Sequence, residues 1–557
     1  MKNTGMQWVA VLSLLLGVSF TASADDDNEP NWNLMLMGNE PQICSSMNQD
    51  ACSSKDWIQA NDMRTARLFN LSDVRRKEAM RRAIWPRERD EIRDRLTLVL
   101  EEMADYFGYG VVPEYRFVDR LRSRAYLDLL SEITEAEYNR LLDSLEMPRL
   151  KGLNEEVNLA ETKGSSANLL REFVAMAAAN SGNEEPLILV VTASARDSFR
   201  DIELYQQAFA AAGAQVKWLP VDATLNRAQR EGLCESLDSL RRSTTGNYDR
   251  ARVYPNFHRQ QQAFCTNKDA WKELVAEADA LFINDGNQSL TRQTFFLRDD
   301  EPTELLVGIH AAMRAGELVV GGAGAGAVAM SSGTMVTSGN SREAMKGGSH
   351  ARRPAAIGCE IDGTCPRGLG TDSLTYHAMG GLGLYPYGVI DTEVSERGRQ
   401  ARMLRLAADT ATPLAMGIDR DTALFMNTDS GQFAVRGSGG VIMLESSQGN
   451  ENMVAGNFHF LRHKSSGRIS HSGVSDILLA EQSRYRPEST TTRFLGDTGV
   501  YDNLQRLCEG RPQVQLLQED FSLLMQRTDD TEFKPTQGRC QVTNATIGVA
   551  WQPEEQR

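Results

Sequence analysis

The chain has 557 residues, of which 41% are hydrophobic and 24% are charged, and its formal net charge is −15. This length implies about two or three domains, and the composition excludes a disordered or fibrous protein. The acidic balance excludes nucleic acid as an expected partner. The simplest explanation of the negative net charge is that it keeps the protein soluble, and the alternative is that it attracts a cationic ligand.

The first 24 residues have the pattern of a secretory signal peptide. Lys2 precedes an apolar run over residues 8–18, and a small-residue cleavage site, Ala22-Ser-Ala24, follows it. The apolar run is shorter than the roughly 20 residues that a bilayer span needs, so no membrane span is expected after cleavage. The sequence therefore predicts a periplasmic or extracellular protein.

Eight cysteines fit an oxidising compartment. They fall into four pairs of sequence neighbours, which predicts four disulfide bonds: Cys44 with Cys52, Cys234 with Cys265, Cys359 with Cys365, and Cys508 with Cys540. Other pairings stay open, because eight cysteines allow 105 connectivities. Metal binding is the competing interpretation, but the chain has no Cys-x-x-Cys pair and only 7 histidines, so no metal site is expected.

Two regions precede the first buried strand. Residues 25–56 are polar and are predicted to form an extended lead-in segment. Residues 57–180 are predicted to form a helical N-terminal domain, because apolar residues recur there near period 3.6. The apolar residues of one such helix are Ile92, Leu96, Val99, Met103 and Phe107. A second helix begins at a capping box formed by Thr134 and Glu137.

At residue 186 the pattern changes to that of an α/β domain with a parallel sheet, predicted over residues 186–480. Short continuous apolar runs indicate strands that are buried on both faces. The expected strands are 187–192, 215–221, 280–284 and 318–320, with a helix carrying Tyr205 and Phe209 after the first. Small or polar residues follow three of these strands, at the strand ends where open parallel sheets bind ligands.

One of these turns, Gly321-Gly-Ala-Gly-Ala-Gly-Ala327, has the form of a strand, a tight elbow and a helix. Such an elbow holds one residue in a strained backbone conformation and presents a hydrolase nucleophile there. Gly324 stands at that position and has no side chain to attack with. The sequence therefore predicts a preserved elbow without its nucleophile.

The end of the chain, residues 481–557, is predicted to be an extension that the Cys508–Cys540 disulfide ties down. Strand-like pieces precede it over residues 468–479. A helical segment is expected around residues 513–525.

Four motifs between residues 186 and 444 resemble, in the same order, those of the cyanophycinase branch of the peptidase E type of serine peptidases. They are the strand and turn at 187–194, Phe282-Ile-Asn-Asp-Gly-Asn-Gln288, the elbow at 321–327, and Val389-Ile-Asp-Thr-Glu-Val-Ser-Glu-Arg-Gly-Arg-Gln-Ala-Arg402. The resemblance implies a class I glutamine amidotransferase-like (flavodoxin-like) α/β domain. It implies no cofactor, and a homodimer is compatible with it.

The departures from the family pattern fall on catalytic positions. Family members have a serine at the position of Gly324 and a histidine at the position of Glu393, and Glu343 stands about where the acid of the triad falls. In a serine hydrolase the histidine takes the hydroxyl proton and later gives it to the leaving amine. Without the hydroxyl there is no nucleophile to activate, so the resemblance implies an inactive site.

The resemblance also locates an oxyanion site. The backbone N–H groups of Gly286 and Ala325 are the expected donors to it. Asp285 takes a position that is a glycine in the family, where the backbone of that glycine lies near the oxyanion site. A negative charge there opposes the negative charge that develops in the transition state.

Binding features are better preserved than catalytic ones. The predicted ligand-binding residues are Asn287, Gln288, Asp391, Arg397, Arg399 and Arg402. In cyanophycinase-like proteins the arginine run borders the cleft and helps to hold a β-aspartyl peptide, and guanidinium groups bind carboxylates bidentately. An equal alternative is that the arginines pair with Glu393, Glu396 and Asp391 and hold a loop together. An insertion that carries Cys359 and Cys365 is longer than the family norm and is expected to reshape the cleft.

The favoured function is binding of a peptide or small ligand, of the β-aspartyl-arginine type, by a secreted and catalytically inactive protein. The alternative from the enzyme class is a serine-type hydrolase of cyanophycin-like β-aspartyl peptides that works through rearranged residues. A third interpretation is a secreted scaffold whose cleft is vestigial. The residues that discriminate between these functions are Gly324 and Glu393.

Overall fold

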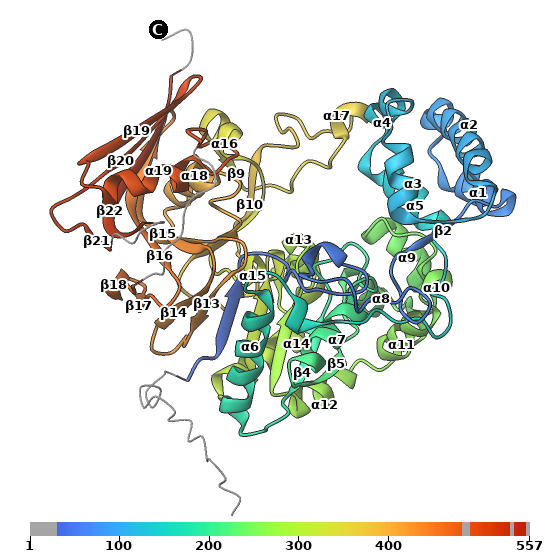
Figure 1. Ribbon diagram of the computed structural model, residues 1–557, viewed down its shortest axis with the longest axis horizontal. Coiled ribbons are helices and arrows are strands. Elements are labelled where there is room, and N and C mark those ends of the chain that lie inside the picture. Colours follow the sequence, from blue (N-terminus) through green and yellow to red (C-terminus); the bar gives the residue numbers. More distant parts are fainter. Residues whose placement is uncertain (1–30, 482–490, 535–539, 553–557) are drawn as a thin grey trace, which may run out of the picture.

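The computed structural model describes residues 31–481, 491–534 and 540–552, and shows a mixed α/β protein (Figure 1). The predicted signal peptide lies outside the described residues. Among the described residues, no helix combines the length and the apolar composition that a membrane crossing requires. Two large sheets carry most of the strands, and helices α1 to α5 lie together at one end of the molecule.

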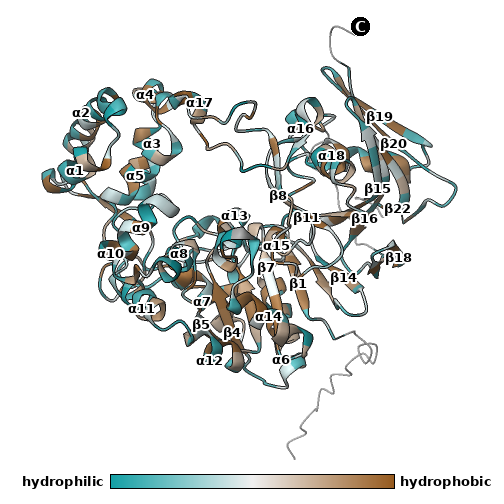
Figure 2. Cartoon of the chain, turned by 180° about the vertical axis from the view of Figure 1, so that it is seen from behind, coloured by the Kyte–Doolittle hydropathy of each residue, from teal (hydrophilic) through white to brown (hydrophobic). Residues whose placement is uncertain are grey.

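A nine-stranded sheet has the order β18-β17-β14-β13-β1-β7-β6-β4-β5. Its strands β4 (Leu187–Val191), β5 (Gln215–Trp218), β6 (Ala280–Ile283) and β7 (Val319–Ala323) are parallel, which confirms the four strands that the apolar runs predict. Figure 2 shows β4 in hydrophobic colours, as expected of a strand covered on both faces. Four further strands, β13 (Thr422–Met426), β14 (Gln432–Gly437), β17 (Ser466–Ser470) and β18 (Gly473–Leu478), are antiparallel and form one edge.

Helices connect and cover the parallel strands. They are α6 (Ser166–Ser181), α7 (Ile202–Ala211), α8 (Ala223–Glu231), α9 (Leu237–Thr244), α10 (Arg250–Val253), α11 (Pro255–Thr266), α12 (Ala270–Glu277), α13 (Gln288–Phe295), α14 (Glu304–Arg314) and α15 (Ala325–Ala329). The predicted helix with Tyr205 and Phe209 is α7. Both side chains are buried in the core, against Phe282 of β6.

Strand β1 (Leu34–Met37) lies in the middle of the nine-stranded sheet, although its residues belong to the predicted lead-in segment. It is parallel to β7 and antiparallel to β13. All four side chains are fully buried. Leu34 and Leu36 join the core on one face of the sheet, and Met35 and Met37 join the core on the other. The lead-in segment is therefore an integral part of the sheet.

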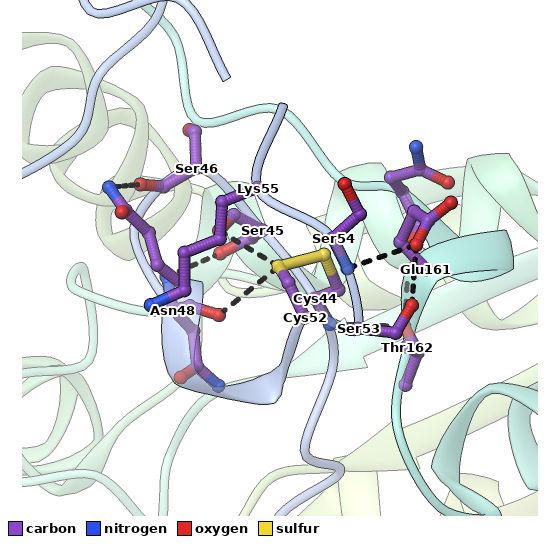
Figure 3. The surroundings of a disulfide bond; sticks show 12 residues. Cys44, Ser45, Ser46, Asn48, Cys52, Ser53, Ser54, Lys55, Glu161 and Thr162 are labelled. Atoms are coloured by element: carbon purple, nitrogen blue, oxygen red, sulfur yellow. Dashed lines mark hydrogen bonds between the residues drawn. A yellow bond between two sulfur atoms is a disulfide. The ribbon is translucent and has the colours of Figure 1, made fainter. Parts of the chain in front are cut away.

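The lead-in segment then forms a short loop that the Cys44–Cys52 disulfide closes (Figure 3). The Ser54 N–H donates to the carboxylate of Glu161 at 3.1 Å, and the Ser53 hydroxyl donates to the same group. The loop is thus held against the segment that leads into α6. The other three disulfides, Cys234–Cys265, Cys359–Cys365 and Cys508–Cys540, also join sequence neighbours, as the cysteine spacing predicts.

The second large sheet has eight strands. They are β11 (Val389–Thr392), β12 (Leu414–Ile418), β15 (Gly440–Asn450), β16 (Met453–Arg462), β22 (Gln541–Trp551), β20 (Phe521–Gln526) and β19 (Gln513–Gln518), with β21 (Glu532–Lys534) paired to β22. Helices α18 (Gln400–Thr410) and α19 (Gly499–Cys508) pack on it. Because β22 pairs with β16, the described part of the predicted C-terminal extension belongs to this sheet.

The helix expected around residues 513–525 is wrong. Those residues form the antiparallel hairpin of β19 and β20. Burial alternates along both strands, with Val514, Leu516, Leu523 and Met525 buried and their neighbours more exposed. This period of two is the strand pattern, and it outweighs the helix propensity of the leucines and glutamines. The strand-like pieces at 468–479 are confirmed as β17 and β18.

The N-terminal helices enclose a core of their own. They are α1 (Asp73–Ala79), α2 (Asp90–Phe107), α3 (Glu114–Leu121), α4 (Leu127–Glu132) and α5 (Glu135–Leu145), with the small strands β2 (Leu68–Asn70) and β3 (Val111–Pro113). The predicted capping box at the start of α5 is present: Thr134 and Glu137 hydrogen-bond each other's backbone N–H. Helix α6, by contrast, buries Leu170 and Phe173 against the nine-stranded sheet.

An arm of the chain spans from the second sheet towards the N-terminal helices. It contains β8 (Met335–Ser338), α16 (Ser341–Gly347), β9 (Ser349–His350), α17 (Cys359–Asp362) and β10 (Leu374–His377). Figure 1 shows α17 beside α4. At Gly358 a Cβ would lie 3.1 Å from Thr134 at the start of α5, so the tip of the arm touches that region.

Six short 3-10 helices complete the described chain: 49–51, 82–84, 87–89, 159–161, 234–236 and 298–300.

Candidate functional site

The predicted elbow is present between β7 and α15. Gly324 has φ 49° and ψ −115°, a combination that glycine adopts easily and that costs other residues roughly 1–3 kcal/mol. It is buried, as are the small residues around it. The backbone therefore keeps the strained geometry of a nucleophile elbow at a residue that has no nucleophile.

The carboxylate of Asp285 lies directly over the elbow. Its Oδ1 accepts hydrogen bonds from the N–H groups of Gly286 and Ala325, both at 2.7 Å, and its Oδ2 accepts from the N–H of Glu40 at 3.0 Å. Gly286 and Ala325 are the two residues expected to form the oxyanion site. The structure brings their N–H groups together, and a resident carboxylate uses both of them.

The same carboxylate fills the volume that a side chain at the elbow would need. A Cβ built on Gly324 would lie 2.0 Å from Oδ1 of Asp285, far inside van der Waals contact. Burial raises the pKa of Asp285 above its ordinary value, and repulsion by Glu393 adds to the rise, while the three backbone hydrogen bonds act in the opposite direction. Asp285 and a nucleophile at position 324 are therefore mutually exclusive in this geometry.

A cleft of about 720 Å³ opens beside the elbow. Its wall is made by the turn after β6, the elbow, β11 and the start of the arm, so the carboxyl ends of strands from both large sheets face it. Of the residues predicted from the sequence, Gly286, Gln288, Ala325, Asp391, Glu393, Arg397, Arg399 and Arg402 line it. Ile357 and Asp372 of the arm also line it, in agreement with the expectation that the insertion reshapes the cleft.

Three of the predicted ligand-binding residues form an internal ion-pair cluster. Asp391 is buried and accepts bidentate hydrogen bonds from Arg402, at 2.6 and 2.7 Å. Arg399 lies 3.4 Å from the same carboxylate and donates to the carbonyl of Thr392 at 2.6 Å. Burial opposes ionisation, but the charges of Arg402 and Arg399 outweigh it and hold the pKa of Asp391 below its ordinary value. This cluster matches the alternative in which the arginines hold a loop together.

Glu393 is also held by arginines. Its carboxylate pairs with Arg397 at 3.1 Å and with Arg420 at 2.5 Å. Burial opposes ionisation, but these two guanidinium groups outweigh it and keep the pKa of Glu393 below its ordinary value. A carboxylate that is ionised and doubly paired is a weak general base, because its proton affinity is lowered.

The remaining predicted residues have structural contacts. The side chain of Asn287 caps α13 by accepting from the Ser289 N–H at 2.9 Å, and Asn287 does not line the cleft. The amide of Gln288 donates to the carbonyls of Val336 and Thr337, at 2.8 and 3.2 Å, and so ties α13 to β8. Glu343 lies in the first turn of α16, half-buried, and is not among the residues that line the cleft.

Sequence reasoning missed one side of the cleft. Glu40, Arg200 and Asp201 line it beside Asp285. Burial raises the pKa of Glu40 to about 8, and the charges of Asp201 and Asp285 contribute. Burial also raises the pKa of Asp201. One signal was available: Glu40 follows the apolar run Leu34–Met37 after a short polar turn, the same pattern that marks the other strand ends.

Replacing Glu40 by glutamine is expected to remove a pH-dependent loss of stability. The pKa of Glu40 is raised in the folded protein to about 8 from an ordinary 4.5. The folded state therefore binds the proton more tightly, and the wild type loses stability as the pH rises from about 4.5 to about 8. Glu40→Gln carries no such proton, so it should exceed the wild type at pH 8 by about 1–3 kcal/mol and differ little at pH 4.5.

Urea unfolding at pH 4.5, 6 and 8 measures this difference. Glu393→Gln is the matched control, because the pKa of Glu393 is lowered and its stabilisation is present at neutral pH. That variant should be less stable than the wild type at pH 8. If Glu40→Gln and the wild type show the same pH dependence, the pKa of Glu40 is not raised in the folded protein.

No substitute nucleophile is apparent at the cleft. Among the described residues that line it there is no histidine or cysteine, although Thr337, Ser338, Thr371 and Thr392 carry hydroxyls. The Thr371 hydroxyl donates to Glu360 at 2.9 Å, but the hydrogen bonds that this exposed carboxylate accepts lower its pKa and make it a weak base. A hydroxyl needs an adjacent base to become a nucleophile. The paired carboxylates of Glu393 and Asp391 do not supply one.

A hydroxyl, an imidazole and a carboxylate do form a chain elsewhere, in the second sheet. His459 Nδ1 lies 2.7 Å from Thr543 Oγ1, and its Nε2 lies 2.7 Å from Glu445 Oε2. His459 is fully buried and Thr543 is 2% exposed, so no substrate reaches the hydroxyl. This chain satisfies buried polar groups of the sheet rather than forming an active site.

A single group of side chains with metal-ligating atoms in proximity is found in the described part of the chain. It consists of Cys359, Glu360 and Cys365. Both sulfur atoms are joined in a disulfide, and a metal is bound by thiolates rather than by a disulfide. The group therefore does not fit a metal ion.

No protein-family model matches the chain. Among solved structures, the chain is similar to a peptidase from an acI-B1 Actinobacterium, with 17% sequence identity and a TM-score of 0.31. The similarity covers 55% of this chain and 91% of that one. A likeness at this level assigns neither a family nor an activity.

Proposed function

We propose that this protein binds a peptide or small ligand at the elbow cleft without hydrolysing it. One observation carries the proposal: the Asp285 carboxylate occupies the space of a nucleophile at Gly324 and uses both N–H groups that would hold an oxyanion. Acyl transfer needs a nucleophile and electrostatic stabilisation of the oxyanion. Neither is supplied at this elbow.

The charges of the cleft favour a ligand with a cationic group. Glu40, Asp201 and Asp285 line one side together with a single basic residue, Arg200, so acidic groups are in excess there, and burial raises the pKa of the three carboxyl groups. A guanidinium or ammonium group placed there favours their charged forms and so gains binding energy. Arg397, whose side chain is 55% exposed, also lines the cleft and suits a ligand carboxylate. A β-aspartyl-arginine peptide carries both groups.

The proposal includes the origin of the site. We assign the chain to the cyanophycinase branch of the peptidase E type, with a class I glutamine amidotransferase-like domain and a helical N-terminal domain, and with its nucleophile and histidine lost. We also propose that the protein is secreted. The order of the four motifs supports the family, and four disulfides support an oxidising compartment.

Calorimetry with β-aspartyl-arginine, together with an assay for released arginine, tests the function. We expect binding, no release of arginine, and an affinity about tenfold weaker in Asp201→Asn. Glu273→Gln on the exposed face of α12 removes an acidic charge far from the cleft and should bind as the wild type does.

Two results would contradict the proposal. Release of arginine at about 1 s⁻¹ or faster would favour the alternative, a serine-type hydrolase of β-aspartyl peptides. Absence of both turnover and binding would leave a scaffold with a vestigial cleft.

A further inference from the structure

A second cavity, of about 300 Å³, lies apart from the elbow. It is formed by the segment that follows α5, the loop before α7 and the start of α11, so the N-terminal helices and the α/β core both contribute to it. Its size is at the lower end for small-molecule sites, which suits a ligand about as large as an amino acid. None of the predicted site residues lines it.

The floor of this cavity is aromatic. Phe199, Tyr254 and Phe257 line it, and their rings lie 6.0 to 6.3 Å apart between centroids. Trp218 packs behind Phe257 in a T-shaped contact at 5.5 Å. Phe257 is half-buried, so part of its ring is available to a ligand, whereas Phe199 is only 1% exposed. A flat apolar group fits such a floor.

The walls are positively charged, although the protein as a whole is strongly acidic. The basic residues that line the cavity are Arg64, Arg149, Lys151 and Arg200, against one acidic residue, Glu203. Glu203 is shared between Arg149 at 2.7 Å and Arg64 at 3.4 Å. Lys151 is exposed and makes no ion pair with any residue that the structure describes, and Arg200 has only a weak one, 3.7 Å from Asp201. The positive charge of the cavity is thus not neutralised from within.

We propose that this cavity binds an aromatic carboxylate, either as a free aromatic acid or as the C-terminal aromatic residue of a peptide. The ring stacks on Phe257, and the carboxylate lies among Arg149, Lys151 and Arg200. Guanidinium and ammonium groups bind carboxylates strongly when part of the contact is shielded from water. The aromatic floor and the excess of basic side chains each indicate one half of the ligand.

The proposed site is independent of the function proposed for the elbow cleft. Arg200 lines both cavities. Of these two cavities, the aromatic one alone is lined by Phe257, Arg149 and Lys151, and the elbow cleft alone is lined by Glu40. Substitutions at the unshared residues therefore test each site separately.

Calorimetry with N-acetyl-L-phenylalanine is the direct test, with a dissociation constant of about 1 mM or tighter expected for a ligand of this size. Two analogues each lack one of the two recognised groups. N-acetylphenylalanine amide has the aromatic ring without the carboxylate charge, and N-acetylglycine has the carboxylate without the ring. Both should bind at least about tenfold more weakly. Comparison of 3-phenylpropionate with the tripeptide Ala-Ala-Phe identifies which source of the carboxylate binds more tightly.

Two variants locate the binding, and a third is their control. Arg149→Gln/Lys151→Gln should weaken N-acetyl-L-phenylalanine about tenfold, and Phe257→Leu about threefold to tenfold while keeping most of the packing. Lys268→Gln, at an exposed turn before α12, is the matched control for the loss of a charge and should have no effect. Glu40→Gln should not change the binding of this probe, and Phe257→Leu should not change the binding of β-aspartyl-arginine.

The inference is overturned if the amide or N-acetylglycine binds as well as N-acetyl-L-phenylalanine, or if the variants at positions 149, 151 and 257 leave binding unchanged. It is also overturned if inorganic phosphate competes fully at equal concentration, because the ring would then be irrelevant. Binding of β-aspartyl-arginine by the wild type is unaffected by any of these outcomes, so failure here is distinct from failure of the proposed function.

Discussion

Serine in place of Gly324 is expected to leave the protein without hydrolytic activity and to destabilise it. The new Cβ would lie 2.0 Å from the Asp285 carboxylate, so Asp285 must leave its three N–H partners. Loss of these charge-assisted bonds and the strain of a non-glycine residue at φ 49° together cost about 3–5 kcal/mol. Urea unfolding measures the loss, and a fluorophosphonate probe reports whether the serine is reactive.

A double-mutant cycle with Asp285→Ala separates the clash from the backbone strain. In the Asp285→Ala background the serine meets no carboxylate, so Gly324→Ser should cost about 1–3 kcal/mol less than in the wild type. Equal costs in both backgrounds would show that the two positions do not compete for space.

Recovery of a reactive serine is expected only when the oxyanion site is also emptied. In Gly324→Ser/Glu393→His the displaced Asp285 carboxylate stays next to the oxyanion site and opposes the negative charge that develops there, so this variant should remain unlabelled by the probe. The triple variant with Asp285→Gly in addition should label. Labelling of the double variant would contradict the role assigned to Asp285.

Replacing Arg250 by methionine is expected to cost about 3–5 kcal/mol, because it strands buried carboxylates. The Arg250 side chain is 1% exposed and donates to Asp197 at 2.6 Å and to Glu146 at 2.9 Å. It also donates to the carbonyl of Asp143 at 3.2 Å. Asp143 and Glu146 belong to the end of α5 and Asp197 to the loop before α7, so the arginine joins the N-terminal helices to the α/β core.

The measurement is urea unfolding with hydrogen exchange of the amides of α1 to α5. Exchange in these helices should rise more than in β4 and β6, because their attachment is lost first. Arg227→Gln breaks the half-exposed pair with Glu231 within α8 and should change stability by less than about 0.5 kcal/mol. A loss of similar size for both variants would argue against a special role of the buried cluster.

Much of the fold could be predicted from local patterns. The four parallel strands, helix α7, the capping box of α5 and the disulfide pairs all depend on residues near one another in sequence. For the hairpin of β19 and β20 two local signals disagree: the leucines and glutamines favour a helix, whereas the alternation of Val514 and Leu516 indicates a strand, and the structure follows the alternation. Strand β1 cannot be predicted from its sequence, because four apolar residues in a polar segment are too few to indicate a central strand, and only pairing with β7 and β13 makes it one.

In the candidate site, too, some features follow from local motifs and others depend on contacts between distant parts of the chain. The elbow at Gly324 and the oxyanion donors Gly286 and Ala325 follow from motifs. The position of Glu40 beside Asp285 depends on β1 lying next to β7, a contact across 245 residues of sequence. The pairing of Arg399 and Arg402 with Asp391 is one of two arrangements that the sequence leaves open, and only the structure shows these ion pairs.

The sequence by itself determined that the elbow has no nucleophile, because the identity of residue 324 needs no neighbour to interpret. Only the tertiary structure decided what stands there instead. Whether a carboxylate at position 285 points to solvent or turns onto the N–H groups of the elbow depends on how two strand ends and the lead-in segment meet. That arrangement is set by packing between distant parts of the chain, which no local pattern encodes.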